Sequence, residues 1–236
     1  MTVKGKVPLD RAISKRGLAS RKDANELVKA GKVLIDGKVI RRTDFMVVPE
    51  TMNIEIVGQA LPKFEPRLIV FHKPKSCTVT TADEKNRKTI YHYLPDINIK
   101  MISVGRLDFA TSGLLFLTNV NKLMDFLTDP KNKIERTYLV TVRGLVSAET
   151  CTAIEQGIEE HRDFLQAKKV VIRKASQKET HLVVTLSEGK NREIRRLFLH
   201  FNHEVTQLKR VSFGNFELDV EVGLYREVAF SELVEK

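Results

Sequence analysis

Residues 104–115 read VGRLDFATSGLL and place one carboxylate, Asp108, in a short loop between two apolar runs. Residues 101–104 before this loop and 114–118 after it are predicted strands, because both runs are short and apolar. Gly105 and Gly113 bracket the loop and can adopt backbone angles that other residues avoid. A loop that is held at both ends by strands can hold a reactive side chain in a fixed position. The alternative is a hairpin on which Arg106 and Asp108 form only a surface ion pair.

The charge of the chain predicts an anionic partner. The 236 residues carry a net charge of +10, and the first 60 residues contain 12 Lys/Arg against 7 Asp/Glu. A quarter of the chain therefore carries half of the net charge. This imbalance favours an N-terminal module that binds a phosphate backbone.

Several other classes of protein do not fit the sequence. No apolar run approaches the roughly 20 residues of a membrane helix, and the N-terminus does not resemble a secretory signal. Cys77 and Cys151 lie far apart, which predicts free thiols in a reducing cytoplasm. His200 and His203 have no acidic or cysteine partner nearby in the sequence, so no metal site is expected.

The first 60 residues are predicted to form a small module of two helices and a hairpin. Residues 9–16 form a short helix, and Ser20 caps a second helix that runs to Ala30. The turn Asp36-Gly37 separates two apolar runs, which is a strong hairpin signal. The second helix presents a basic face made of Arg21, Lys22 and Lys29.

This module resembles the S4-type RNA-binding domain. The resemblance lies in GLASRKDA at residues 17–24 and GKVLIDGK at residues 31–38. It implies that Arg21, Lys22 and Lys29 contact RNA phosphates, which fixes position but carries little sequence information. The alternative is a solvated basic helix without a ligand. Residues 61–66, which contain Pro62 and Pro66, are predicted to be a linker.

The remaining residues, 67–236, are predicted to form a second domain in which strands dominate. Strands are expected at 68–72, 136–143, 168–173, 181–186, 204–211, 216–222 and 227–230. Short helices are expected at 89–94, at 147–156 and from Asn191. Another should be capped by Asn119, bury Leu123, Met124 and Leu127, and end before Pro130. Strands and helices do not alternate regularly, so we predict an α+β fold with a mostly antiparallel sheet.

The spacing of apolar residues in the predicted helix after Gly189 indicates where its arginines point. Ile194, Leu197, Phe198 and Phe201 follow helical spacing and form its buried stripe. Arg195 lies on the border of that stripe, where an ion pair with a carboxylate gains strength. The other cationic side chains should face solvent or phosphate; these are Lys190, Arg192 and Arg196.

Four segments of the second domain resemble the pseudouridine synthases. They are GRLD at 105–108 with the following TSGLL, ERTYLV at 135–140, EGKNREIRRL at 188–197 and LKRVSFG at 208–214. Together with the S4-type module, they resemble the ribosomal-RNA branch of the family. The third segment is more similar to the large-subunit rRNA enzymes than to the small-subunit enzymes. The sequence departs from the family at two places. Phe109-Ala110 follows the Asp where polar residues are common, and Glu193 stands where Gln is frequent.

The resemblance implies isomerisation of uridine to pseudouridine in ribosomal RNA or a pre-ribosomal particle. Asp108 would be the nucleophile, Arg195 would pair with it and keep it charged, and Tyr138 would stack on the uracil and assist proton transfer. The target base would leave its stack to enter the pocket. The remaining candidate RNA contacts are Arg106, Lys190, Asn191, Arg192 and Arg196.

The reaction is redox-neutral and needs no external group, so we predict no cofactor, and we expect a monomer. Two other hypotheses stay open. The chain could be an RNA-binding or ribosome-assembly protein with a structural loop at Asp108, or another base-acting enzyme with a carboxylate nucleophile. For Tyr138, the plain alternative is a tyrosine of the sheet core.

Overall fold

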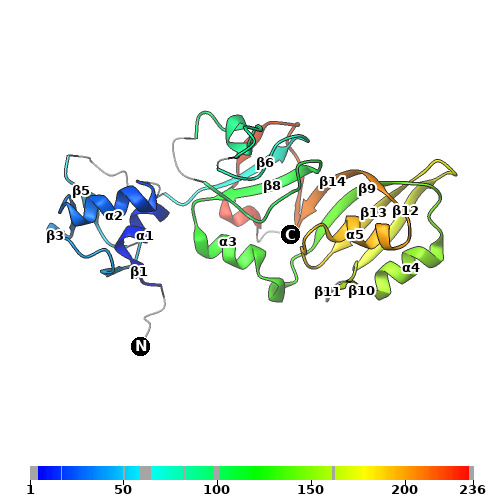
Figure 1. The fold of residues 1–236 in the computed structure, drawn as a ribbon, viewed down its shortest axis with the longest axis horizontal. Helices are drawn as coiled ribbons and strands as arrows, with labels where there is room; N and C mark the ends of the chain where they lie inside the picture. Colours follow the sequence, from blue (N-terminus) through cyan, green and yellow to red (C-terminus); the bar gives the residue numbers. More distant parts are fainter. Residues whose placement is uncertain are drawn as a thin grey trace. The chain divides into compact units, whose positions relative to one another are not determined.

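The computed structural model describes residues 5–16, 18–49, 51–58, 65–81, 83–97, 101–160 and 163–233. The chain divides into two compact units (Figure 1), each described here by itself. The first unit extends to Arg67 and includes two short later segments, Asp96–Ile102 and Asn119–Asn121. Residues 61–64 of the predicted linker lie outside the described residues, and the exact domain boundaries stay a prediction.

The N-terminal unit contains the predicted helices and hairpin. Its helices are α1 (Leu9–Lys15) and α2 (Arg21–Lys29), and its strands are β1 (Val7–Pro8), β2 (Val33–Ile35), β3 (Lys38–Ile40), β4 (Met46–Val47) and β5 (Ile54–Ile56). The Ser20 hydroxyl accepts a hydrogen bond from the Asp23 N–H, which confirms the predicted cap. Ala12, Ile13, Ala24 and Val28 from the two helices are completely buried in one apolar core with the strands.

The second unit is organised around one large sheet. The strand order is β12 (Lys169–Ala175), β13 (Glu179–Leu186), β9 (Arg136–Arg143), β14 (Val205–Phe213), β8 (Ser112–Thr118), β6 (Leu68–Lys73) and β16 (Tyr225–Glu227). Neighbours along this path pair antiparallel, except that β14 and β8 run parallel. Two further short strands join it, β7 (Ile102–Ser103) and β15 (Phe216–Glu217). The predicted α+β class with a mostly antiparallel sheet is confirmed.

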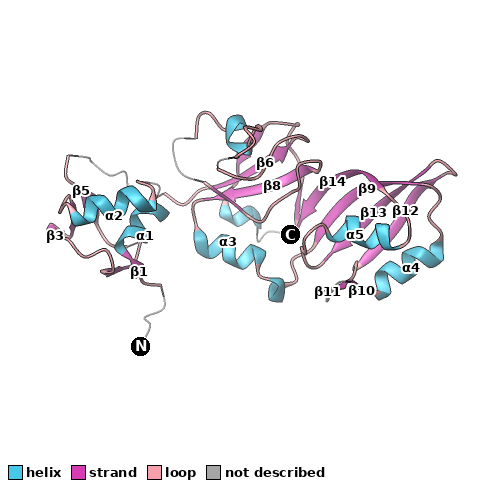
Figure 2. Cartoon of the chain, in the orientation of Figure 1, coloured by secondary structure: helices cyan, strands magenta, loops and turns pink. Residues whose placement is uncertain are grey.

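Short helices lie against this sheet (Figure 2). They are α3 (Asn121–Thr128), α4 (Ala148–Gln156), α5 (Glu193–His200) and three 3₁₀ turns, η1 (Ile90–Tyr93), η2 (Pro130–Asn132) and η3 (Phe230–Leu233). Leu127 of α3 packs in an apolar cluster with Leu114, Phe116 and Phe213 of the sheet. Among the described residues, no helix is both long enough and apolar enough to cross a membrane.

Three predictions about local structure were wrong, and one hairpin was not foreseen. The Asn119 side chain does not cap α3; it accepts from the Arg67 N–H at 2.7 Å and donates to the Glu65 carbonyl at 2.8 Å. The strand predicted at 216–222 is limited to β15, which ends at Glu217, and the one predicted at 227–230 is instead β16 followed by the turn η3. Residues after α4 form an unpredicted hairpin, β10 (Ile158–Glu160) and β11 (Asp163–Leu165), because its three-residue strands are too short for a periodic signal.

Candidate active site

The Asp108 loop is fixed at both ends by the backbone. The Val104 N–H donates to the Phe116 carbonyl at 2.8 Å, and the Thr111 N–H donates to the Asp108 carbonyl at 3.0 Å. Gly105 has a φ of +70° and Gly113 a φ of +115°, so both glycines use the backbone region predicted for them. Asp108 therefore projects from a loop whose shape does not depend on its own side chain.

Lys73, at the end of β6, is hydrogen-bonded to the backbone of the Asp108 loop. Its ammonium is completely buried and donates to three carbonyls, those of Thr111 at 2.8 Å, Pro74 at 3.0 Å and Asp108 at 3.1 Å. Burial lowers the pKa of Lys73, whereas Cys77 and Asp108 act in the opposite direction. The three bonds join the strand end to both sides of the reactive loop.

Gly113 also permits the close approach of β8 to β14. A Cβ built on Gly113 would lie 2.2 Å from the Arg210 carbonyl oxygen and 2.5 Å from the Arg210 backbone nitrogen. No side chain fits there without separating the two strands. The sheet therefore depends on this glycine at the point where Asp108's loop enters β8.

Two arginines from the start of α5 approach the same oxygen of Asp108. The Arg192 Nη1 lies 3.5 Å and the Arg195 Nε 3.8 Å from Asp108 Oδ2. Arg195 is the more sheltered, with 15% of its side chain exposed against 55% for Arg192. Burial and the charge of Arg192 lower the pKa of Arg195, and the Asp108 carboxylate raises it. The predicted sheltering of Arg195 is seen, and the approach of Arg192 to the carboxylate was not foreseen.

Asp108 opens onto a pocket of ≈ 280 Å³. Tyr138 of β9 and Leu208 of β14 line this pocket together with Asp108, and Tyr138 is only 7% exposed. Tyr138 and Arg210 are directly opposite each other in the β9–β14 register. The arrangement brings a carboxylate and an aromatic ring to one concave site, as the sequence predicted.

The pocket also carries two buried guanidinium groups that the sequence analysis missed. Arg136 and Arg210 are 6% and 3% exposed, and their Cζ atoms lie 4.8 Å and 5.1 Å from the centre of the Phe213 ring. The Arg210 Nε donates to the Leu114 carbonyl at 2.7 Å. Burial is the main cause that lowers the pKa of Arg136, and Tyr138 acts against it. The pocket wall is therefore positively charged.

Glu193 is a buried carboxylate in the wall of the same pocket. It is 3% exposed, and its Oε2 accepts from the Lys190 N–H at 3.0 Å, which closes the turn before α5. Burial raises the pKa of Glu193 above its ordinary value, and the bond from Lys190 acts in the opposite direction. Glutamine would make the same bond without a charge to bury.

We expect the Glu193→Gln variant to unfold less readily than the parent, with a gain that grows as the pH rises above about 4.5. The unfolded chain loses the Glu193 proton near the ordinary pKa of 4.5, whereas the folded chain loses it at higher pH. The contribution of Glu193 to the free energy of unfolding therefore falls across the pH window between these two pKa values. The fall is about 1.4 kcal/mol for each pKa unit that separates them. Urea denaturation across the window measures the difference. An equal gain at every pH would contradict the argument.

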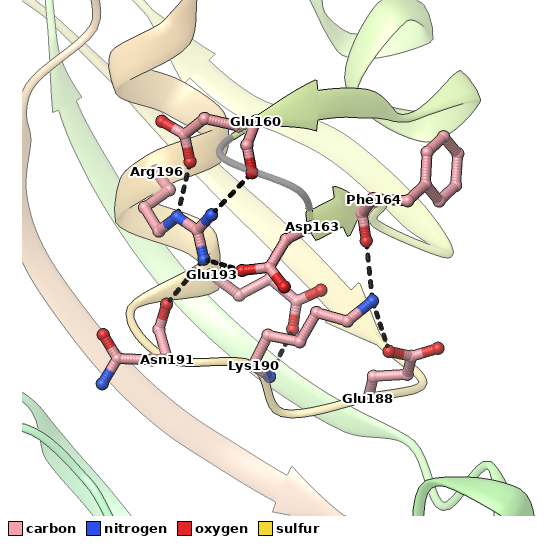
Figure 3. Close-up of polar contacts among 8 residues, drawn as sticks. All are labelled: Glu160, Asp163, Phe164, Glu188, Lys190, Asn191, Glu193 and Arg196. Atoms are coloured by element: carbon pink, nitrogen blue, oxygen red, sulfur yellow. Dashed lines mark hydrogen bonds and ion pairs between the residues drawn. The ribbon is translucent and has the colours of Figure 1, made fainter.

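Lys190 and Arg196 form internal ion pairs rather than facing solvent, as Figure 3 shows. The Lys190 ammonium contacts Glu188 Oε2 at 2.7 Å and the Phe164 carbonyl at 2.6 Å. Arg196 contacts Glu160 Oε2 at 2.5 Å and Asp163 Oδ2 at 2.8 Å, and its side chain is 20% exposed. We predicted that these two side chains face solvent or phosphate; instead they are partly exposed and paired, because the unforeseen β10–β11 hairpin supplies partners for both.

The other candidate RNA contacts are accessible. Arg106 is exposed and lines the pocket beside Asp108. Asn191 borders a second hollow next to the loop. In the N-terminal unit, Arg21, Lys22 and Lys29 are exposed on α2 as predicted, and Arg21 Nε lies 3.8 Å from Asp10 Oδ2.

Sequence signals for the missed residues differ. Arg210 lies two positions after Leu208 on a strand, so alternation places both on one face and could have indicated a buried arginine. Arg136 likewise shares a face with Tyr138. Lys73 lies between His72 and Pro74, after the apolar run 68–71, and no pattern there marks a buried ammonium.

The fold and the site together define an enzyme that acts on a nucleic-acid base: a carboxylate-bearing loop at a base-sized pocket, preceded by a basic helical module. Residues 67–200 match the RNA pseudouridylate synthase family, and residues 7–53 match the S4 domain. The chain belongs to the RNA pseudouridine synthase family, whose members are isomerases, and it carries an S4 domain.

Curated relatives and a solved structure extend over almost the whole chain. It is 34% identical over 212 residues to "Ribosomal large subunit pseudouridine synthase B" of Bacillus subtilis, which covers 89% of this chain and 86% of the relative. It is 33% identical over 232 residues to an uncharacterized RNA pseudouridine synthase of Aquifex aeolicus, which covers 97% and 93%. A crystal structure of a pseudouridylate synthase matches with a TM-score of 0.67 and 27% identity, covering 97% of this chain and 98% of the other.

Proposed function

We propose that this protein isomerises a uridine of ribosomal RNA to pseudouridine, with large-subunit rRNA as the substrate and Asp108 as the nucleophile. The partner is the rRNA or a pre-ribosomal particle, and the protein acts as a monomer in the cytoplasm. The relative from Bacillus subtilis is named for the large ribosomal subunit, which supports this choice of substrate.

One observation carries the proposal: Asp108 is held at the mouth of a pocket that also contains Tyr138, with Arg195 within 3.8 Å of the carboxylate. Lys73 donates hydrogen bonds to the loop, and the Phe116 carbonyl accepts one from the Val104 N–H. These bonds preorganise the loop that carries the carboxylate before RNA arrives. Arg192 and Arg195 favour the ionised carboxylate, which is the form that can attack.

The chemistry uses these residues in sequence. The bond between C1′ and N1 breaks, the uracil rotates, and a bond forms between C1′ and C5. The proton on C5 then leaves, and N1 of the rotated ring gains a proton. Asp108 acts on the ribose or the base while the glycosidic bond is open, and Tyr138 stacks on the uracil and assists the proton transfer. Atoms and electrons balance within the substrate, so we propose that no cofactor takes part.

The RNA contacts divide into two kinds. We assign Arg106, Asn191 and Arg192 to direct contact with the substrate strand, because they border the two hollows that Asp108 also lines. Lys190 and Arg196, which also stood among the candidates, instead hold the β10–β11 hairpin against the start of α5. Their effect on RNA would be exerted by shaping this wall of the pocket.

The deciding experiment incubates the purified protein with unmodified large-subunit and small-subunit rRNA transcripts. Carbodiimide adducts and reverse-transcriptase stops then map pseudouridine, with Asp108→Asn in parallel. We expect one new stop in the large-subunit transcript, absent with the variant. A stop only in the small-subunit transcript would overturn the substrate assignment. RNA binding without any stop in either transcript, or in purified pre-ribosomal particles, would favour a non-catalytic assembly protein.

Neutralising the basic face of α2 should weaken RNA binding and flatten its salt dependence. In the triple variant Arg21→Ala, Lys22→Ala and Lys29→Ala, the slope of log K against log salt should decrease by about 2, since each phosphate contact contributes about 0.7 to 0.9. Filter binding of the rRNA transcripts over a range of salt concentrations measures this slope.

A control removes the same charge from another part of the chain. Lys169, Lys174 and Lys178 are exposed on or beside β12, and their replacement by alanine should leave most of the slope intact. An equal decrease in both variants would show that only net charge matters and would refute a local role for α2.

A further inference from the structure

Two hollows meet at the Asp108 loop. One is the pocket of ≈ 280 Å³ that contains Tyr138, and the other is a larger hollow of ≈ 610 Å³. Residues 105–108 and Lys190 border both hollows. A single uridine occupies the smaller pocket in the proposed reaction, so the chemical steps at the target base do not use the larger hollow.

Phe109 supplies an aromatic ring to the larger hollow. It directly follows Asp108 and lines that hollow but not the smaller pocket, and it is 39% exposed. Its carbonyl accepts a hydrogen bond from the Ser76 N–H at 2.8 Å, so the backbone that carries the ring is fixed. An accessible aromatic ring in a basic groove is the usual platform on which an unpaired nucleobase stacks.

Arg87 holds a cation next to this ring. Its Cζ lies 5.4 Å from the centre of the Phe109 ring. Asp83 fixes the guanidinium, with Nη2 to Oδ1 at 2.6 Å and Nε to Oδ2 at 3.1 Å. These bonds are the main cause that lowers the pKa of Asp83 to about 2. The ring and the cation are thus prearranged, and 43% of the Arg87 side chain stays accessible.

The charges around the larger hollow favour a polyanion. Arg87, Arg106, Lys190 and Arg192 line it, of which Lys190 is already paired with Glu188, whereas Asp83 and Asp108 are the carboxylates among its described lining residues. Both carboxylates already face arginines, Asp83 facing Arg87 and Asp108 facing Arg192. Phosphate groups would therefore meet an excess of cationic donors.

We propose that the larger hollow binds the nucleotide next to the target uridine on the same RNA strand. Its base stacks on Phe109, and its phosphate lies near Arg87 and Arg106. The shared wall is the reason: a strand that places one base beside Asp108 in the smaller pocket brings the adjoining nucleotide to the hollow that shares residues 105–108 with it. This inference rests on the proposed function, since it needs a target uridine in the smaller pocket.

The first test compares Phe109→Ala and Phe109→Tyr with the parent protein in single-turnover reactions on the large-subunit transcript. The matched control is Phe126→Ala, because Phe126 on α3 is also an exposed phenylalanine, at 57%, and lies outside both hollows. Phe109→Ala should raise the half-saturating protein concentration by about 5- to 150-fold, the loss expected for one stacked base. The rate at saturation, the Phe109→Tyr variant and the control should stay near the parent values. A lower saturated rate with unchanged half-saturation would overturn the inference.

The second test removes the neighbouring base instead of the ring. Short RNAs around the mapped uridine carry an abasic site at the position before it or after it. One of these RNAs should bind the parent protein as weakly as intact RNA binds Phe109→Ala. The affinity of that RNA should be no lower for Phe109→Ala than for the parent protein. Additive losses at both positions would overturn the inference. If the parent protein is active and Phe109→Ala has the same half-saturating concentration, the inference is overturned but the proposed function is not. A parent protein that forms no pseudouridine would overturn the proposed function and this inference together.

Discussion

Replacing Asp108 with asparagine is expected to lower the rate of pseudouridine formation by at least about 10⁴-fold, the scale of loss when a catalytic carboxylate or nucleophile is removed. Asparagine has nearly the same shape, so the loop bonds from Lys73 to the backbone of residues 108 and 111 should persist. What is lost is the anion that Arg192 and Arg195 face. Single-turnover conversion of the large-subunit transcript measures the rate.

The same variant should bind RNA about as well as the parent protein. The catalytic contact belongs to the transition state, and removing a negative charge beside phosphate can only favour the complex. Thermal unfolding of both proteins checks that the fold is retained. A variant that keeps more than a tenth of the parent rate would show that Asp108 is not the nucleophile.

Replacing Lys73 with methionine should damage both stability and catalysis. Methionine fills a similar volume but leaves the carbonyls of Pro74, Asp108 and Thr111 without their buried donor. The cost in free energy of unfolding should be about 3 kcal/mol, because each unsatisfied buried acceptor costs about 1 to 3 kcal/mol and the lost ammonium no longer has to be desolvated. A shift of about 1 Å in the loop should also lower the saturated rate by about 100-fold.

Lys75→Met is the matched control, since Lys75 lies two residues further along the chain and its side chain is exposed. It should leave the unfolding midpoint in urea and the saturated rate near the parent values. The two readouts for Lys73→Met should be taken at a temperature where the variant is fully folded. Loss of stability without loss of rate would refute the role of Lys73 in positioning Asp108.

The sequence was informative wherever local pattern and tertiary packing agree. The cap at Ser20, the hairpin around Asp36-Gly37 and the α+β class were all predicted, because capping and turn chemistry act over a few residues. Asn119 was misplaced as a helix cap because its partners, Arg67 and Glu65, lie more than 50 residues earlier in the chain. Contacts of that kind leave no periodic signal.

The candidate site shows the same division. Asp108, Tyr138 and Arg195 were named from motifs, and the structure brings Asp108 and Tyr138 to one pocket with Arg195 close to the carboxylate. Their catalytic roles remain predictions. Lys73 was missed because an isolated lysine is normally exposed, and its burial follows only from three carbonyls supplied by the loops around it.

The parallel pairing of β8 with β14 has a consequence for how the enzyme is made. The Arg210 side chain bonds the Leu114 carbonyl across a sequence separation of 96 residues. Pairings between such distant positions form late in folding, because the entropy of closing the intervening chain is lost first. Asp108 lies on the loop that leads into β8, whereas the pocket residues Tyr138 and Leu208 lie on β9 and β14. A nascent chain that has not yet released β14 from the ribosome therefore has no pocket, and activity should arise in a single step when synthesis of the sheet is complete.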